Sequence, residues 1–313
     1  GLNMTTASTR EVFGQTLLEL GRQDPNIVVL GGDLNVSTFA HLFAREFPER
    51  FFDLGPAEQN IMSMAAGFAS AGKTAFATTF AVFGTARPYD QLRIGISQPR
   101  ANVKVVCTHA GILTAEDGIS AQSIEDLALM CALPGFRVIV PADGPETAAA
   151  VRVAASEPGP FYIRLSRPPT PVIHEDAFGF RLGKAETVRS GKDVSIIACG
   201  IMVAVALEAA ENLAKTGVQC RVINMATLKP LDEEAITKAA RETGAIVTAE
   251  EHYINGGLGS LVAQTVVRTQ AVPLEMVALT GYGESGQPDE LLTKFGLTAA
   301  DVENGVRRVL QRK

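Results

Sequence analysis

Short apolar runs alternate with amphipathic stretches along most of the chain. The runs that predict strands cover residues 26–30, 51–54, 74–80, 103–108, 137–141 and 160–165, and the stretches that predict helices cover 9–23, 58–71, 89–97, 123–131 and 145–155. Short runs rich in Val and Ile that are separated by helices are typical of a parallel sheet covered on both faces. The first half of the chain therefore predicts an open α/β domain.

The alternation stops near the middle of the chain and then resumes. Pro168-Pro169-Thr170-Pro171 breaks the pattern, so residues 168–181 are expected to form a linker. The second series has predicted strands at 194–199, 220–224, 245–249 and 274–278 and predicted helices at 203–216, 233–243 and 257–269. We therefore expect two α/β domains, at residues 4–167 and 182–313.

Composition narrows the class of protein. The chain has 313 residues, of which 46% are hydrophobic and 20% charged, which suits two ordinary globular domains. The formal net charge of −6 and the lack of basic runs argue against nucleic-acid binding. No apolar run is as long as a membrane span and no signal peptide is visible, so we expect a cytoplasmic protein without a membrane partner. Gly1-Leu2-Asn3 before Met4 resembles a cloning remnant.

The residues that usually bind metals or nucleotides show no such arrangement. Cys107, Cys131, Cys199 and Cys220 lie within apolar segments and predict buried thiols of a reduced compartment. The four histidines are not at metal-ligand spacing, so no metal site is expected in this chain. Neither a G-x-G-x-x-G run nor a P-loop is present. The glycines of residues 256–259 precede a helix and either cradle an anion or allow close packing of helix on strand.

One acid stands at the junction of an apolar strand and a helix rich in small residues. Glu58 lies in the run Asp53-Leu-Gly-Pro-Ala-Glu-Gln-Asn60, and alanines and a glycine follow along the helix. An acid in the first helical turn is favoured by the helix dipole, which is a sufficient structural explanation by itself. In apolar surroundings the same acid can also hold or exchange a proton near neutral pH. Glu58 is therefore a candidate catalytic acid.

Polar and aromatic residues gather in the loops that follow the strands of the first domain. Ligands of open parallel sheets bind at the carboxyl ends of the strands. The residues at this edge are Asp33, Ser37, Glu58, Phe80, Phe83, His109, Glu116, Asp117, Arg164 and Arg167. Each has a structural explanation alone; Phe80 and Phe83, three residues apart, are most often core residues at such spacing. Together they predict one pocket with an acid, an aromatic wall, a histidine and anion-binding groups.

Several of these segments resemble thiamine diphosphate enzymes, in the same order along the chain. The matching elements are Gly55–Asn60 (G-x-A-E-Q-N), Thr79–Phe83 (T-F-x-x-F), Thr108-His109 with Glu116-Asp117-Gly118, and Leu165-Ser166-Arg167. In the second half, residues 228–231 and 250–259 resemble the C-terminal domain of transketolases. From Met4 onward the chain is similar to the C-terminal half of a transketolase, here as a separate subunit.

The resemblance implies a role for each matched residue. It makes Glu58 the partner of the N1′ nitrogen of the aminopyrimidine of thiamine diphosphate, whose proton promotes the imino form that generates the reactive carbon. Phe83, with Phe80 beside it, would stack against the pyrimidine, and Asp33 would also be a cofactor-binding residue.

The substrate residues implied by the resemblance form a second group. Arg10, Ser37, His109 and Arg167 match the positions that hold the phosphate of a sugar, a group that the guanidinium fork suits. Asp117 matches a position that reads the C2 hydroxyl. This pattern implies transfer of a two-carbon ketol unit from a ketose phosphate to an aldose phosphate.

Two departures from the family pattern change the expectation. The Gly-Asp-Gly of the metal–diphosphate motif is absent from the sequence. An N-terminal partner subunit should therefore supply the Mg²⁺ and diphosphate half-site, in an α2β2 heterotetramer that belongs to pentose phosphate metabolism. Ala121 stands where the family usually has a histidine that binds sugar hydroxyls. A branched, deoxy or otherwise modified sugar is therefore an alternative to the usual substrates.

Three other interpretations remain open at the level of sequence. A 2-oxoacid dehydrogenase β subunit has the same order of two domains, but the phosphate-binding group and Gly55–Asn60 count against it. A deoxyxylulose-phosphate synthase fragment is favoured by Tyr89-Asp90-Gln91, although that family is usually a single chain. A scaffold subunit that has lost its chemistry is supported only by Ala121 and opposed by Glu58, Phe83 and His109.

Overall fold

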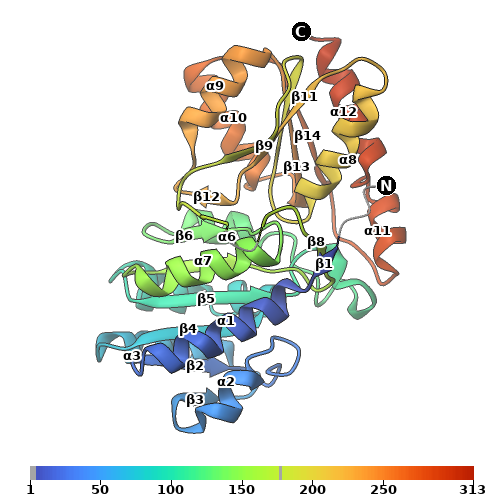
Figure 1. The fold of residues 1–313 in the computed structure, drawn as a ribbon. Coiled ribbons are helices and arrows are strands. Elements are labelled where there is room, and N and C mark those ends of the chain that lie inside the picture. Colours follow the sequence, from blue (N-terminus) through green and yellow to red (C-terminus); the bar gives the residue numbers. More distant parts are fainter. Residues whose placement is uncertain (1–4, 176–177) are drawn as a thin grey trace.

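The structure, a computed structural model, describes residues 5–175 and 178–313 and consists of two α/β domains (Figure 1). Residues 1–4, with the predicted cloning remnant and the predicted start of the first domain at Met4, lie outside the described part, as do residues 176–177 of the predicted linker. Parallel strands dominate both sheets, so the predicted two-domain α/β fold is confirmed.

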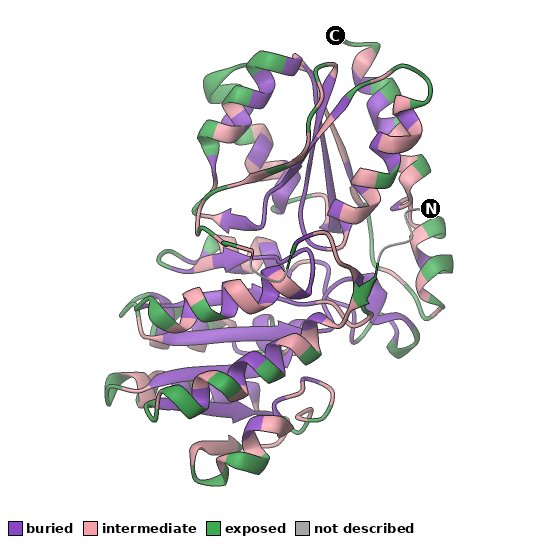
Figure 2. Cartoon of the chain, viewed as in Figure 1, coloured by how far each residue is buried: buried purple, intermediate pink, exposed green. Residues whose placement is uncertain are grey.

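The sheet of the first domain has seven strands in the order β12-β6-β7-β5-β4-β2-β3. Six of them run parallel: β2 (Ile27–Gly31), β3 (Phe51–Asp53), β4 (Thr74–Phe80), β5 (Val103–Thr108), β6 (Arg137–Ile139) and β7 (Phe161–Arg164). The central strands are buried along their length, as the purple arrows of Figure 2 show. A sheet covered on both faces explains why these strands read as continuous apolar runs.

Helices cover both faces of this sheet. Residues of α3 (Glu58–Ser70) and α6 (Asp126–Ala132) pack in one core with Val28 of β2, and residues of α1 (Thr9–Gln23) and α7 (Gly144–Ser156) pack in the other with its neighbour Val29. Alternate residues of a strand point to opposite faces, so each strand serves both cores. The carboxyl ends of the strands, and the loops that follow them, are left for the site.

Shorter elements complete the first domain. They are β1 (Thr6–Ala7), α2 (His41–Glu46), η1 (Pro48–Arg50), α4 (Ala81–Thr85), α5 (Tyr89–Gln91), the π-helical η2 (Leu92–Ser97), η3 (Ile112–Asp117) and β8 (Thr170–Pro171). The antiparallel pair β1–β8 ties the start of the predicted linker to the beginning of the chain. The predicted helix at 89–97 is thus a short α-helix followed by a π-helical turn, and the helix predicted from 123 begins at Asp126.

The sheet of the second domain has five strands in the order β14-β13-β10-β11-β9. They are β9 (Glu186–Arg189), β10 (Val194–Ala198), β11 (Cys220–Asn224), β13 (Ile246–Tyr253) and β14 (Leu274–Leu279), all parallel except β9. The helices are α8 (Met202–Ala214), α9 (Glu233–Thr243), α10 (Leu258–Thr269), α11 (Pro288–Lys294) and α12 (Ala299–Leu310). Residues of α8 and α12 pack on one face of the sheet, and residues of α9 and α10 on the other.

A strand of the second half completes the sheet of the first. β12 (Thr227–Lys229) pairs antiparallel with β6, with Thr227 opposite Ile139. The Lys229 ammonium donates to the carbonyls of Cys131 and Leu133 at 2.9 and 2.6 Å. Sequence analysis missed this strand because three residues carry no periodic signal, and it missed β9 for a similar reason.

Candidate functional site

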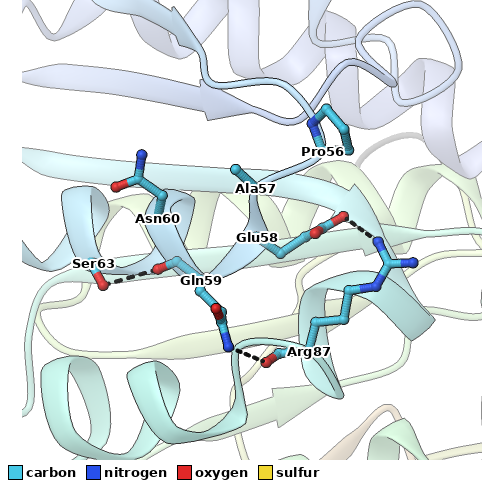
Figure 3. A pocket seen from close by; sticks show the side chains of 7 residues that line it. All are labelled: Pro56, Ala57, Glu58, Gln59, Asn60, Ser63 and Arg87. Carbon is cyan, nitrogen blue, oxygen red and sulfur yellow. Dashed lines mark hydrogen bonds and ion pairs between the residues drawn. The ribbon is translucent and has the colours of Figure 1, made fainter.

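Glu58 is the first residue of α3 and lies in a hollow of about 630 Å³ (Figure 3). The turn before it contains Gly55, whose φ of +69° favours glycine. Only 4% of Glu58 is exposed, and its carboxylate accepts a hydrogen bond from the Arg87 guanidinium at 3.2 Å. Glu58 is thus a nearly buried acid at the wall of an open hollow, and its carboxylate is paired with the Arg87 guanidinium, which also lines the hollow.

Arg87 also covers the aromatic wall. Its guanidinium carbon lies 4.3 Å from the ring centroid of Phe83, and 53% of its side chain is exposed. A planar cation therefore donates to Glu58 while it lies over an aromatic ring. Sequence analysis did not single out Arg87; its place four residues after Phe83 was the available signal.

Phe80, Phe83 and His109 form an aromatic group, which Arg87 connects to this hollow through its contact with Phe83. The Phe80 ring is stacked on the His109 ring at 3.6 Å between centroids, and it lies 6.0 Å from Phe83 with an interplanar angle of 12°. Phe80 ends β4 and His109 follows β5, and these strands are neighbours. Pairing of the two strands thus brings together residues that are far apart in sequence.

His109 is a neutral imidazole near pH 7. Its backbone has φ of +58°, an unfavourable conformation for a residue other than glycine and one that clusters at functional sites. Burial, with the charges of Arg10 and Arg167, lowers the pKa of His109 to about 3. Thr108 Oγ1 lies 2.8 Å from its Nδ1. His109 therefore offers hydrogen bonds and a ring face, but no positive charge, to an anion.

Arg10, Ser37 and Arg167 lie together. The Arg10 guanidinium donates to the backbone carbonyl of Ser37 at 2.7 Å and to that of Arg167 at 3.0 Å. Burial and the nearby charge of Arg167 lower the pKa of Arg10. Arg167 in turn donates to the Thr114 carbonyl at 3.2 Å and to the Glu116 carboxylate at 3.4 Å. These two neighbouring guanidinium groups, of which Arg167 is paired with the Glu116 carboxylate, make a positive corner.

Asp33 and Asp117 are exposed, and the structure does not join them to Glu58 by a contact among the described residues. The Asp33 amide donates to the Asp53 carboxylate at 3.0 Å, and the Gly55 amide donates to the same oxygen at 3.0 Å. Asp53 thereby holds the loop that precedes Glu58. Asp117 ends η3, the turn that also carries Glu116.

Arg164 lies away from the pocket in which sequence analysis placed it. It is 6% exposed and pairs with Asp126 at 2.8 Å, and it also donates to the backbone carbonyl of Glu251 at 2.8 Å. A guanidinium this buried needs such partners to offset its lost hydration. Arg164 joins the two domains and is not an anion-binding group.

The glycine-rich start of α10 is filled by the chain itself. The amides of Leu258 and Gly259 donate to the buried Glu250 carboxylate at 2.7 and 2.9 Å. A Cβ at Gly257 would lie 2.2 Å from the same carboxylate, so the glycine makes room for it. Both alternatives at residues 256–259 hold: Gly257 leaves room for the chain's own Glu250 carboxylate, and a Cβ at Gly259 would lie 2.9 Å from Thr248 Oγ1 of β13, so Gly259 allows close packing of helix on strand.

The described part of the chain offers neither a metal cluster nor a membrane span. No group of three or more His, Cys, Asp and Glu residues in residues 5–175 and 178–313 is placed to hold a metal ion. Within the same ranges no helix has both the length and the apolar character needed to cross a bilayer. At the hollow, Glu58 presents a carboxylate and Phe83 a ring face, both now in contact with the Arg87 guanidinium.

Comparison with known families identifies both halves of the chain. The family described as "Transketolase, pyrimidine binding domain" matches residues 5–172, and "Transketolase, C-terminal domain" matches residues 183–302. Neither rival enzyme family of the sequence analysis is supported over transketolase.

Individual relatives agree with this match. The "Putative transketolase C-terminal section" of Methanocaldococcus jannaschii is 42% identical over 96% of the chain and 95% of its own length. A 6-deoxy-6-sulfo-D-fructose transketolase subunit of Clostridium sp. is 40% identical over 97% of the chain and 95% of its own length. The chain spans about half of human transketolase-like protein 2, at 39% identity over 97% of this chain and 49% of that protein.

A solved structure agrees along its whole length. It is described as "Split gene transketolase, inactive beta4 tetramer" and matches with a TM-score of 0.91 and 47% identity over 99% of this chain and 100% of the other. The chain therefore belongs to the transketolase family and forms a C-terminal section, a pyrimidine-binding domain followed by a transketolase C-terminal domain.

Proposed function

We propose that the chain is the C-terminal subunit of a thiamine diphosphate-dependent transketolase that transfers a two-carbon ketol unit between sugars. The observation that carries this proposal is the group of Glu58, Arg87 and Phe83. The guanidinium donates to a nearly buried acid and lies over an aromatic ring. A protonated aminopyrimidine is also planar, also donates through N–H groups and also stacks, so the same three-part arrangement suits it.

The residues of this chain would bind and orient the cofactor and exchange a proton with it. The Glu58 carboxyl would hold a proton at the oxygen now bonded to Arg87, against a ring nitrogen of the cofactor, and Arg87 would move toward solvent. Phe83 and Phe80 would orient the ring by stacking. Asp33 is proposed at the edge of the cofactor site. When bound, thiamine diphosphate supplies the carbon nucleophile that carries the transferred unit.

The positive corner formed by Arg10 and Arg167 is proposed to hold the anionic end of the sugar. Ser37 and the neutral His109 would complete the site with hydrogen bonds, and Asp117 would accept from a sugar hydroxyl. Because burial and the nearby charge of Arg167 lower the pKa of Arg10, an anion that pairs with both guanidinium groups is the proposed occupant.

The other half of the site is proposed to come from a partner. The sequence has no Gly-Asp-Gly, and the described residues offer no metal cluster. An N-terminal subunit would hold Mg²⁺ and the diphosphate, in an α2β2 heterotetramer located in the cytoplasm. The related beta4 tetramer, which contains only this type of subunit, is described as inactive, and this supports the dependence on a partner.

The donor is proposed to be a modified ketose, used in place of the usual pentose phosphates or together with them. Ala121 is 8% exposed and stands where the family usually has a histidine. One relative is named for a sulfonated sugar, 6-deoxy-6-sulfo-D-fructose. Phosphate and sulfonate are both tetrahedral anions that a guanidinium pair can bind.

The test is reconstitution. The chain with thiamine diphosphate and Mg²⁺ should not turn over xylulose 5-phosphate or 6-deoxy-6-sulfofructose in the presence of an aldose phosphate. Addition of an N-terminal subunit that carries Gly-Asp-Gly should give transfer from at least one of them. Activity of the chain alone would refute the shared site, and activity on pyruvate without any on sugars would refute the ketol transfer.

A further inference from the structure

The second domain reaches the candidate site through a buried glutamate. Glu251 lies on β13, is 4% exposed and accepts a hydrogen bond from the Leu113 amide at 2.8 Å, although 138 positions separate the two in sequence. Leu113 belongs to η3, which ends in Glu116 and Asp117. The carboxylate therefore touches the backbone of the turn that presents the proposed substrate residues.

This turn has a conformation that needs outside support. Ala115 within it has φ of +63° and ψ of −116°, and the glycines on either side, Gly111 and Gly118, both have φ of +78°. A residue other than glycine is strained in such a region and persists there only where its surroundings fix it. The conformation of the turn is therefore not set by its own sequence alone.

Glu251 is fixed firmly enough to supply that support. Arg164, which pairs with Asp126, donates to the Glu251 carbonyl at 2.8 Å. A Cβ at Gly111 would lie 2.1 Å from Glu251 Oε1, so the glycine is what allows the carboxylate to approach the turn. Burial raises the pKa of Glu251 to about 7, so burying its carboxylate costs free energy that an apolar residue at this position would not cost.

We propose that Glu251 is a positioning residue that holds the turn at residues 112–117 through the Leu113 amide, so that the second domain sets the place of Asp117 at the sugar. This inference rests on the proposed function for its kinetic part only. It assigns the C-terminal domain a part in substrate binding besides that of packing and assembly.

The neighbouring glutamate provides a matched control. Glu250 is 1% exposed, its pKa is also raised to about 7 by burial, and it also accepts from backbone amides. Those amides belong to α10 of its own domain. The variants Glu251→Ala and Glu250→Ala thus remove comparable carboxylates, and only the first releases the turn.

The first readout is amide hydrogen exchange in the purified chain, which needs neither cofactor nor substrate. Glu251→Ala should speed exchange at residues 111–118 by about tenfold or more, since a buried amide loses its acceptor. Glu250→Ala should leave that segment protected at equal loss of stability, and Glu251→Gln, which keeps an acceptor oxygen, should restore most of the protection. Equal exchange in the two alanine variants would overturn the proposal.

The second readout is kinetics of the reconstituted enzyme. Glu251→Ala should raise KM for the donor ketose about tenfold, and its effect should not add to that of Asp117→Ala, because both remove the same contact with the sugar. Fully additive effects of Glu251→Ala and Asp117→Ala on KM would overturn the positioning role. An unchanged KM in a Glu251→Ala variant whose residues 111–118 exchange faster would also overturn it. Failure of the wild-type enzyme to transfer ketol units would refute the proposed function and leave the exchange result to decide the contact.

Discussion

The edges formed by the carboxyl ends of the strands lie in different surroundings in the two sheets, although both domains have the same α/β architecture. In the first domain, the loops at this edge lead to Glu58 and its open hollow and to the partly exposed guanidinium of Arg167. In the second domain, the ends of β10, β11 and β13 face the first domain. Since ligands of open parallel sheets bind at this edge, the hollow of about 630 Å³ at Glu58 makes the first domain the candidate for ligand binding.

The second edge is occupied by contacts between the domains. The Gly200 amide, after β10, donates to the Val140 carbonyl at 3.3 Å. Asn224, at the end of β11, donates to the Glu146 carboxylate of α7 at 2.9 and 3.0 Å. His252 of β13 accepts from the amides of Leu127 and Ala128 at 3.1 and 3.3 Å, so it caps a helix of the other domain.

The histidines illustrate the difference. Burial lowers the pKa of His252 to about 4, which leaves the neutral ring free to accept from those amides. His109 is neutral for the same reason, yet its ring lies against Phe80 beside the proposed pocket. In our proposal polar residues at the first edge bind ligands, whereas Gly200, Asn224 and His252 at the second edge hold the domains together. Apart from Glu251, whose side chain reaches the turn at residues 112–117, substitutions at the two edges should therefore separate activity from stability.

The largest effect is expected at Glu58. Glu58→Gln should lower kcat of the reconstituted enzyme by about 10²–10⁴-fold, because the amide cannot exchange a proton with the ring nitrogen. Its thermal midpoint should stay close to that of the wild type. Glu290→Gln, an exposed acid in the first turn of α11, is the control for a helix-dipole effect and should change neither quantity. Loss of stability without loss of kcat would place Glu58 with the residues of the second edge.

A smaller effect is expected at Arg10. Arg10→Ala should raise KM for a phosphorylated or sulfonated ketose about tenfold or more, since it removes a charged donor from the positive corner. The change should be much smaller for a ketose without the anionic group. Arg22→Ala, on the same helix and paired with Glu46 at the surface, should leave KM unchanged. Equal effects on both ketoses would contradict anion binding at this corner.

At the second edge, Asn224→Ala should act on stability alone. The buried Glu146 carboxylate would lose both bonds from the amide, which should lower the free energy of unfolding by about 1–3 kcal/mol. kcat and KM should remain those of the wild type at a temperature where both proteins are folded. Asn304→Ala, at an exposed position of α12, is the control. A raised KM in Asn224→Ala would show that contacts of the second edge other than that of Glu251 also affect the site.

The pH dependence of stability should report His174, which lies between Asp143 at 3.0 Å and Glu186 at 2.9 Å. Although burial opposes its charge, the Asp143 carboxylate, with Glu146 and Glu186, raises the pKa of His174 to about 9. A raised pKa in the folded state stabilises the fold below the unfolded value of about 6.5, and this contribution is lost as pH rises toward 9.

The measurement is the thermal midpoint of the wild type and His174→Gln between pH 6 and about 9.5. Lys104, whose pKa burial lowers to about 7, and Glu146, Glu250 and Glu251, whose pKa values burial raises to about 7, also titrate in this window, so the test uses the difference between the two proteins. The wild type should be the more stable at pH 6, and the two should converge by a few degrees near pH 9. A constant difference would contradict the charged pair.

Sequence reasoning recovered the architecture where periodicity was strong. The Val- and Ile-rich strands at residues 27–31 and 103–108 and most of the long helices were visible, because burial on both sides of a strand, or on one stripe of a helix, leaves a repeating pattern. α12 was missed although Val302, Val306 and Val309 follow helical spacing, so that signal was available and unused.

The candidate site was recovered only in part. Motifs identified Glu58, Phe80, Phe83 and His109 as neighbours at one edge, since parallel strands bring their carboxyl ends together. They could not reveal Arg87 as the partner of Glu58, nor separate Arg164 from the pocket. The role of Glu251 depends on a contact between two domains, and no local pattern records which carboxylate will meet which amide.

The pairing of β12 with β6 limits how the chain can be divided. If the first domain were produced without the residues after the linker, β6 would become an outer strand with unpaired amides and carbonyls along one side. Such bare edges invite other chains to add strands and lead to aggregation. The pyrimidine-binding half should therefore aggregate when it is produced alone. A fusion partner is better attached at either end of the whole chain than between its two domains.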